Sequence, residues 1–189
     1  MKDSQHGHKK SLIFLTGFMG SGKSTIGPIL ANTLGFQYFD VDRHIEQKAN
    51  KQVAEIFNLE GEQVFRSLER DALLKLTELN HCVISLGGGT IANEENCQLV
   101  LQKGILVYLK LSLEEIIQRV QYRSDRPMLK DEHGNQLSPS ELKNRVLDLM
   151  TRREQFYARA DVVINADNMR VGATVDAIMK DIYFMIDKE

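Results

Sequence analysis

The chain has 189 residues, of which 42% are hydrophobic and 26% are charged, and its formal net charge at pH 7 is -2. This length predicts one compact domain, and the balanced charge argues against a nucleic-acid-binding protein, which needs a basic surface. No apolar run is long enough to cross a bilayer, and the two cysteines lack metal-ligand spacing and suit a reducing compartment. We therefore expect a cytoplasmic protein with neither a nucleic-acid nor a membrane partner.

The first half of the chain alternates between strand-like and helix-like segments. Residues 1–10 are polar and lack the apolar segment of a signal peptide, so we expect a disordered lead-in. Residues 12–16 form a short apolar run typical of a strand that is buried on both faces. Helical spacing then predicts a helix over 24–34 with Gly35 as its C-cap, and "FQYF" predicts a second strand that ends at Asp40.

The remaining segments continue the alternation. We expect helices from about 43 to 79 with a break near Gly61, and "SPSE" predicts a helix start with Ser138 as the N-cap. The other expected elements are strands at 82–86, 105–111 and 161–165 and helices at 93–102, 113–122 and 171–186. Residues 123–137 are polar and aperiodic.

Five short apolar strands separated by helices predict a three-layer α/β/α sandwich around a five-stranded parallel sheet. We expect this fold to form a single domain over 11–189. In such sheets, ligands bind beyond the carboxyl ends of the strands. Residues that follow Thr16, Asp40 and Leu86 should therefore meet in one crevice.

A phosphate-binding motif follows the first strand. Gly17, Gly22, Lys23 and Ser24 match G-x-x-x-x-G-K-[ST] between a strand and a helix, as this motif requires. The loop amides, the helix N-terminus and Lys23 would cradle the phosphates of a nucleotide, most simply ATP. The expected ATP-binding residues of the loop are Gly20, Ser21, Gly22, Lys23, Ser24 and Thr25. The alternative is a glycine-rich turn whose lysine is solvated.

Other signals narrow the class of nucleotide-binding protein. The chain has no N-K-x-D element for reading guanine, and the third strand ends at Ser85 without an acidic residue. The acidic residues instead follow the second strand as "DVD" (40–42), an arrangement that resembles small-metabolite kinases related to nucleoside monophosphate kinases.

The ordered motifs of the chain resemble the shikimate kinase family. They are "GFMGSGKST", "FDVD", "GEQVFRSLE", "LGGG", "RPML" and "RREQFY", spread over nearly the whole chain. The chain departs from the family pattern at Met128, where leucine is usual, and at Arg152, where lysine is common. The resemblance implies a monomeric P-loop kinase that uses ATP and Mg²⁺ to phosphorylate the 3-hydroxyl of shikimate, on the pathway to chorismate.

Two arginines are candidates for binding the shikimate carboxylate. A guanidinium binds a carboxylate in a two-pronged manner, and the resemblance gives this role to Arg66 and Arg153. Glu69 lies on the same helical face as Arg66 and could hold it, although Arg66 could equally pair with Glu62 on a solvated face. Periodicity alone does not choose between Arg153 and its neighbour in "TRRE", and the family match selects Arg153. The resemblance also makes Gly88 the glycine expected to touch shikimate.

Two aspartates are candidates for the reacting centre. We expect Asp42 to hold the accepting hydroxyl, either as a general base or only by orienting it. Asp40 would lie on the Mg²⁺ side together with the hydroxyl of Ser24. Both aspartates could alternatively be helix N-caps.

The aperiodic stretch 123–137 has the composition of a mobile lid. We expect its closure to bring Arg126 onto the transferred phosphoryl group, where it would act in catalysis and bind ATP. Arg119 resembles the family residue that stacks on adenine. For each arginine, a solvated surface position is the alternative.

Two other functions remain possible from the sequence. A gluconate kinase of the same architecture would also bind a carboxylate and hydroxyls, although "DVD", "FRSLE" and "GGG" argue against it. A nucleotide-binding regulatory module without catalysis is the second alternative.

Overall fold

A computed structural model of the chain describes residues 10–121, 129 and 135–187. Its strands are β1 (Leu12–Thr16), β2 (Gln37–Asp40), β3 (Cys82–Ser85), β4 (Ile105–Lys110) and β5 (Val162–Asn165). Its helices are α1 (Lys23–Leu34), α2 (Val41–Ala49), α3 (Val53–Glu60), α4 (Glu62–Leu76), α5 (Glu94–Lys103), α6 (Leu113–Val120), α7 (Pro139–Tyr157) and α8 (Val171–Ile182). Within the described residues, none of these helices has the length and apolar character needed to span a membrane.

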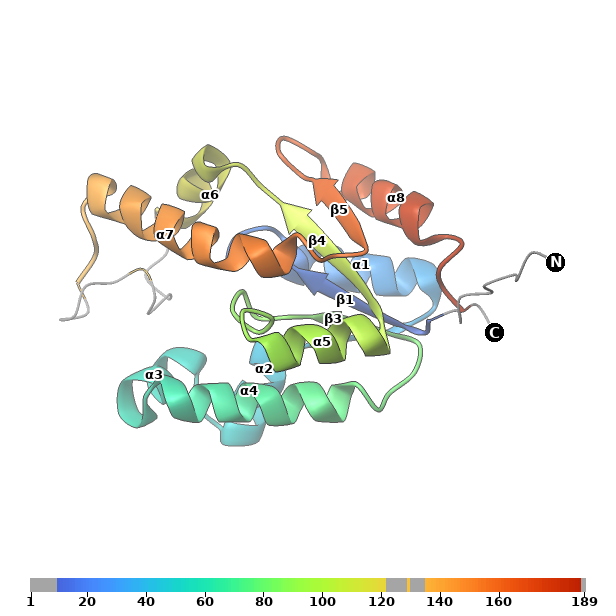
Figure 1. The fold of residues 1–189 in the computed structure, drawn as a ribbon, viewed down its shortest axis with the longest axis horizontal. Helices are drawn as coiled ribbons and strands as arrows, with labels where there is room; N and C mark the ends of the chain where they lie inside the picture. The colour runs from blue at the N-terminus through green and yellow to red at the C-terminus, as the bar shows by residue number, and fades with distance from the viewer. Residues whose placement is uncertain (1–9, 122–128, 130–134, 188–189) are drawn as a thin grey trace.

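The five strands form one parallel sheet in the order β2-β3-β1-β4-β5 (Figure 1). β1 lies at the centre, paired with β3 on one side and β4 on the other. Because all strands run the same way, their carboxyl ends open at one edge. The prediction of a five-stranded parallel sheet is confirmed.

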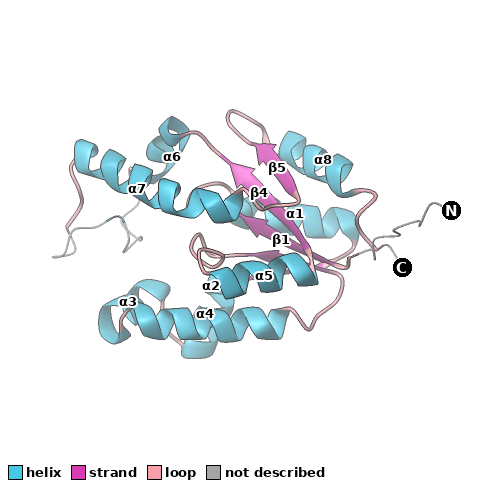
Figure 2. Cartoon of the chain, in the orientation of Figure 1, coloured by secondary structure: helices cyan, strands magenta, loops and turns pink. Residues whose placement is uncertain are grey.

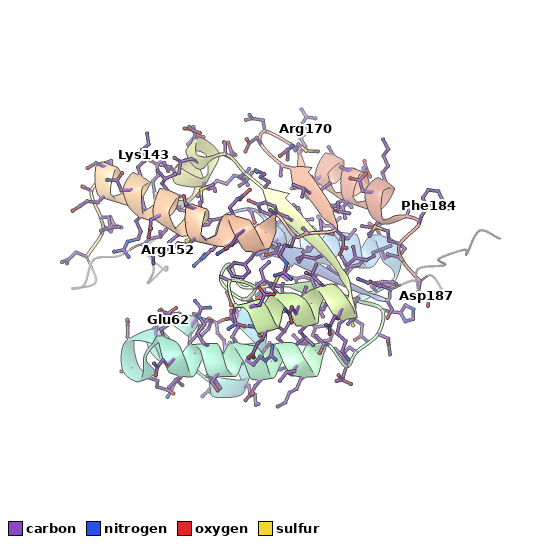
Figure 3. All side chains as sticks on the ribbon, viewed as in Figure 1. Glu62, Lys143, Arg152, Arg170, Phe184 and Asp187 are labelled. Atoms are coloured by element: carbon purple, nitrogen blue, oxygen red, sulfur yellow. The ribbon has the colours of Figure 1, made fainter. Side chains whose placement is uncertain are left out.

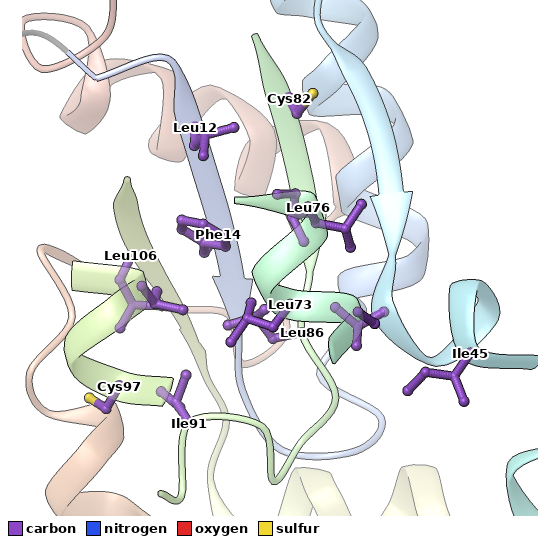
Figure 4. Packing of buried hydrophobic residues seen from close by; sticks show 14 of the residues in the cluster. Leu12, Phe14, Ile45, Leu73, Leu76, Cys82, Leu86, Ile91, Cys97 and Leu106 are labelled. Carbon is purple, nitrogen blue, oxygen red and sulfur yellow. The ribbon is translucent and has the colours of Figure 1, made fainter. Parts of the chain in front are cut away.

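Helices cover both faces of the sheet (Figure 2), and alternate residues of β1 explain why. Leu12 and Phe14 pack on one face with α4 and α5, whereas Ile13 and Leu15 pack on the other face with α1 and α8. Figure 4 shows the first of these cores, in which Leu73 and Leu76 of α4 approach β1. The side chains of all five β1 residues are buried, as the unbroken apolar run predicts.

Capping residues set several helix boundaries where the sequence predicted them. Gly35 ends α1 in the left-handed conformation, with φ 71°. Ser138 and Glu141 form a capping box at the start of α7, with Pro139 in the first turn. The Asn93 side chain accepts a hydrogen bond from the Asn96 amide and so caps α5.

The structure differs from the prediction in the helical region 43–79, which contains three helices. The predicted break at Gly61 is present, but the chain also turns between α2 and α3, where Asn50 is left-handed with φ 50°. The last helix ends at Ile182 and not at 186. Ile186 instead makes a parallel bridge with Lys10, whose ammonium donates to the carbonyl oxygens of Leu101 in α5 and of Gly104, which follows that helix.

Candidate active site

The loop between β1 and α1 has the geometry of a phosphate-binding nest. Gly17, Gly20 and Gly22 have φ values of 145°, 81° and 96°, which only glycine adopts without strain. A side chain at Gly17 would also stand 2.6 Å from the carbonyl oxygen of Leu109. Gly22 is the N-cap of α1 and makes no side-chain hydrogen bond there, and a helix N-terminus of this kind favours an anion.

Lys23 lies in the first turn of α1 and folds back over this loop. Its ammonium donates to the carbonyl oxygens of Gly17 at 2.8 Å and Phe18 at 3.2 Å. A cation held over a ring of loop amides forms a strongly anion-attracting position. The residues of the predicted phosphate site therefore lie together within a few residues of β1.

A cavity of about 320 Å³ opens beside the loop. Every described residue that we predicted to bind ATP or Mg²⁺ lines it, namely Gly20, Ser21, Gly22, Lys23, Ser24, Thr25, Asp40 and Arg119. Another part of its wall comes from the start of α8 and the preceding turn, with Ala166, Met169, Val171 and Thr174. The sequence left the contacts of this wall undetermined.

A second, smaller cavity of about 70 Å³ adjoins the first. All four predicted substrate residues line it: Asp42, Arg66, Gly88 and Arg153. Its apolar wall includes Phe57 and Phe65, whose rings lie 4.6 Å apart. The two cavities share Met19, Asp42, Gly87 and Gly88. The phosphate site and the smaller cavity therefore meet at Asp42 and the glycine loop.

The glycines Gly87 and Gly89 let three charged side chains approach the backbone closely. A Cβ on Gly87 would stand 2.8 Å from Asp42 Oδ1 and 2.9 Å from Glu69 Oε1. A Cβ on Gly89 would stand 2.9 Å from Arg66 Nη2. Any larger residue here would occupy the space between these groups, so the loop's small size shapes the cavity.

Arg66 is held by two carboxylates. Its Nη1 donates to Glu69 Oε2 at 2.7 Å, and its Nη2 donates to Glu62 Oε1 at 3.0 Å. Glu69 is only 1% exposed and also accepts from Thr90 Oγ1 at 2.7 Å. Burial disfavours the charge of Arg66, but the attraction and hydrogen bonds of Glu69 and Glu62 outweigh it and raise the pKa of Arg66.

The structure separates the two neighbouring arginines of α7. Arg153 is buried, lines the smaller cavity and lies with its guanidinium carbon 5.5 Å from the centre of the Phe18 ring. Arg152 has 74% of its side chain exposed and pairs with Asp148. It faces an outer cavity of about 520 Å³, which Glu62 of α4 borders from the other side (Figure 3). Arg153 is therefore the one that points inward.

The two aspartates differ in their local roles. The side chain of Asp40 accepts from the Arg43 amide at 3.2 Å and caps α2, whereas Asp42 lies in the first turn of that helix. Asp40 also receives a long hydrogen bond of 3.4 Å from the Tyr38 hydroxyl. Burial, with the negative charge of Asp40 adding to it, raises the pKa of Tyr38 to about 12, although the Ser85 hydrogen bond partly opposes this. The capping alternative therefore holds for Asp40, which still lines the larger cavity.

Arg119 of α6 connects this helix to the phosphate loop. Its Nη1 donates to the carbonyl oxygen of Gly20 at 3.0 Å, and its Nε donates to Glu115 at 2.8 Å. The side chain therefore lines the larger cavity and is held by two partners, unlike a freely solvated arginine. Arg126 and most of the predicted lid 123–137 lie outside the described residues.

The sequence analysis missed several side chains that hold the site together. Tyr157 donates a hydrogen bond to the carbonyl oxygen of Gly88. Asn96 donates to the Thr90 carbonyl at 2.8 Å and accepts from Arg70, so it fixes the turn that carries Thr90. The only sequence signal for Tyr157 was its position four residues after Arg153 in the family motif.

A phosphate-binding loop at the centre of a parallel sheet faces, across a shared wall, a small pocket with two arginines and an aspartate. Together these features define a P-loop phosphotransferase that acts on a small acidic metabolite. The family model described as "Shikimate kinase" matches residues 19–183. The chain belongs to the shikimate kinase family.

Individual relatives agree with this assignment. The chain is 47% identical over 172 residues to the shikimate kinase of Chlorobium limicola, covering 91% of this chain and 86% of that protein. It is 46% identical to the enzyme of Chlorobaculum tepidum over 91% of this chain and 90% of that protein.

Solved structures show the same fold. The shikimate kinase from Acinetobacter baumannii in complex with shikimate matches with a TM-score of 0.83 and 32% identity, covering 92% of this chain and 93% of that one. The enzyme from Bacteroides thetaiotaomicron matches with a TM-score of 0.81 and 32% identity, covering 89% and 96%. The protein is thus an ATP-dependent kinase with shikimate kinase activity in the pathway to aromatic amino acids. The gluconate kinase and regulatory-module alternatives are set aside.

Proposed function

We propose that the smaller cavity binds shikimate through Asp42, Arg66, Gly88 and Arg153. Arg66 and Arg153 pair with the carboxylate, and Asp42 accepts a hydrogen bond from the 3-hydroxyl. The supporting observation is that all four residues line one cavity, which adjoins the phosphate loop at Asp42 and Gly88. The relative from Acinetobacter baumannii, whose structure is a complex with shikimate, gives independent support for the ligand.

The same arrangement supports a direct phosphoryl transfer from ATP. The 3-hydroxyl oxygen forms a bond to the γ-phosphorus while the bond from that phosphorus to the β,γ-bridging oxygen breaks, and ADP leaves. The hydroxyl proton passes to Asp42 or, if Asp42 only orients the hydroxyl, to solvent. Lys23 neutralises charge on the β- and γ-phosphates, and we assign Arg126 the same task on the transferred group.

We propose Mg²⁺ as the metal that accompanies ATP. Ser24 and Asp40 line the larger cavity, and their side chains carry the oxygen ligands that suit a hard cation. Among the described residues, no group of three or more acidic, histidine or cysteine side chains could hold a metal alone. A site with few protein ligands fits Mg²⁺, which keeps waters and binds phosphate oxygens. When bound, the ion would offset the negative charge of the phosphates.

For the nucleotide, we propose that Gly20, Ser21, Gly22, Ser24 and Thr25 surround the phosphates and that Arg119 packs on adenine. The apolar wall from Ala166 to Thr174 lies in the same cavity and offers a surface for a flat base.

We also propose that residues 11–189 form one domain, in which 43–79 hold the substrate and 123–137 form a lid. We propose that the enzyme is a monomer in the cytoplasm. The two buried free cysteines, Cys82 and Cys97, are compatible with a reducing compartment.

A coupled assay of ADP release tests the proposed pocket, using shikimate, gluconate and nucleoside monophosphates as acceptors. ADP release with shikimate alone supports the proposed pocket.

Arg153→Ala should raise the KM for shikimate by about 100-fold, because it removes a two-pronged charged contact worth roughly 3 kcal/mol. Arg152→Ala is the matched control and should stay within about twofold of wild type, because its side chain is 74% exposed. An unchanged KM in Arg153→Ala would remove this residue from the carboxylate site.

A further inference from the structure

The three glycines at the end of β3 differ in how their carbonyl groups are held. The Thr90 amide donates to the carbonyl oxygen of Gly87 at 3.1 Å, and the Ala92 amide donates to that of Gly89 at 3.0 Å. Both partners lie within the loop itself. The carbonyl oxygen of Gly88, in contrast, accepts a hydrogen bond from the hydroxyl of Tyr157, which lies 69 residues further along the chain on α7.

The Tyr157 side chain is firmly placed. It is 1% exposed, and its ring lies 4.8 Å from the ring of Tyr108 of β4, with 35° between the two planes. Burial raises the pKa of Tyr157 to about 12, with Arg153 partly offsetting the effect, so the hydroxyl remains a hydrogen-bond donor at neutral pH. The donor that holds Gly88 is thus buried, packed against a second ring and protonated at neutral pH.

Fixing the Gly88 carbonyl fixes a whole peptide group. The peptide between Gly88 and Gly89 is planar and trans, so its N–H points away from its C=O. The carbonyl points to Tyr157, which does not line the acceptor cavity, whereas Gly88 and Gly89 both do. The amide of Gly89 therefore points away from Tyr157, and it belongs to a residue that lines the acceptor cavity.

The same contact sets the position of Gly88 between two other parts of the site. A Cβ on Gly88 would stand 3.3 Å from Arg153 Nη1 and 3.6 Å from both the Gly17 carbonyl oxygen and the Met19 amide. Gly88 therefore separates the inward-facing arginine from the phosphate loop. Because Arg153 and Tyr157 are one turn apart on α7, this helix holds both the arginine and the glycine loop beside it.

From this geometry we propose that Tyr157 is a positioning residue for the acceptor. Its hydroxyl fixes the Gly88–Gly89 peptide so that the Gly89 amide and Arg153 face the same bound shikimate molecule. The inference rests on the proposed function, in which Gly88 and Arg153 belong to the shikimate site. Tyr157 itself touches neither substrate in this account and acts through the glycine loop and through its hydroxyl's contact with Arg153.

Tyr157→Phe tests the inference, since phenylalanine keeps the packed ring and removes only the hydroxyl. Loss of the hydrogen bond leaves a buried carbonyl unpaired, so we expect the KM for shikimate to rise about tenfold. The KM for ATP should change less than about twofold, because the donor does not hold the phosphate loop. Tyr108→Phe is the matched control: it removes a hydroxyl from the stacked partner ring, where the hydroxyl donates to Glu154 at 3.2 Å.

Three outcomes would overturn the inference: an unchanged KM for shikimate in Tyr157→Phe, an equal rise of both KM values, or the same rise in Tyr108→Phe. The rise in melting temperature that shikimate causes supplies a second measurement for a destabilised variant. Tyr157→Phe should show a smaller rise with shikimate and a normal one with ATP. Arg153→Ala, assayed in parallel, separates the two proposals. If Arg153→Ala raises the KM for shikimate and Tyr157→Phe does not, only the inference on Tyr157 fails. If Arg153→Ala leaves this KM unchanged, the proposed pocket fails.

Discussion

Replacing Glu69 with glutamine removes a negative charge from a buried position and leaves the side-chain shape nearly unchanged. The carboxylate receives hydrogen bonds from Arg66 and Thr90, both at 2.7 Å, and is 1% exposed. In Glu69→Gln, the remaining oxygen can still accept from Arg66 and the new NH₂ group can donate to the Thr90 hydroxyl, but the hydrogen bond to Arg66 loses its negatively charged acceptor. Loss of one charge-assisted hydrogen bond costs roughly 1.5–3 kcal/mol, and the charge of Arg66 loses its buried partner as well.

We therefore expect Glu69→Gln to lower the free energy of unfolding by about 2–3 kcal/mol. The KM for shikimate should rise at least tenfold, because Arg66 is no longer held toward the acceptor cavity. Urea unfolding followed by circular dichroism measures the first effect, and the coupled ADP-release assay measures the second.

Glu62→Gln is the matched control, because Glu62 binds the same guanidinium with a side chain that is 54% exposed. An exposed ion pair contributes little, so this variant should lose less than about 0.5 kcal/mol. If the two variants lose the same stability and keep a normal KM, then Glu69 does not position Arg66, and the reasoning from burial is wrong.

Three further changes have expected outcomes. Lys23→Ala should lower kcat at least about 100-fold in the ADP-release assay, because Lys23 supplies the charge over the phosphate loop, and a near-normal kcat would remove it from catalysis. Gly27→Ala would place a methyl group against the Tyr38 ring and should cost about 1–3 kcal/mol in urea unfolding; an unchanged midpoint would contradict this packing. Burial raises the pKa of both Tyr38 and Tyr157 to about 12. The stability that they contribute is complete below pH 10 and is lost as the pH rises toward 12, by about 1.4 kcal/mol per tyrosine and pH unit. Tyr38→Phe should therefore lose stability less steeply over this range, and an equal slope would refute the prediction.

Local sequence signals predicted most of the fold. The unbroken apolar run Leu12–Thr16 identified the central strand. Gly35 marked the end of α1 through its left-handed backbone, and Ser138 marked the start of α7 through its side chain. The turn between α2 and α3 was missed because Asn50 adopts a left-handed conformation that sequence patterns assign mainly to glycine. Neither glycine nor proline marks that turn.

The site was predictable where its residues form short motifs and not where they meet through the fold. The motifs predicted Lys23, Asp42 and Arg66, and the structure places all three along the two adjoining cavities. The hydrogen bond from Tyr157 to Gly88 joins residues 69 positions apart, and only the packing of α7 on the sheet brings them together. Burial in the same packing separates Arg153 from Arg152, a choice that helical periodicity alone left open.

A crystal structure with shikimate, Mg²⁺ and an ATP analogue that cannot transfer its γ-phosphate tests the central claim most directly. We expect the carboxylate of shikimate between Arg66 and Arg153, the 3-hydroxyl beside Asp42 and the γ-phosphate at Lys23. A shikimate molecule bound outside this pocket, or with its carboxylate away from both arginines, would contradict the account.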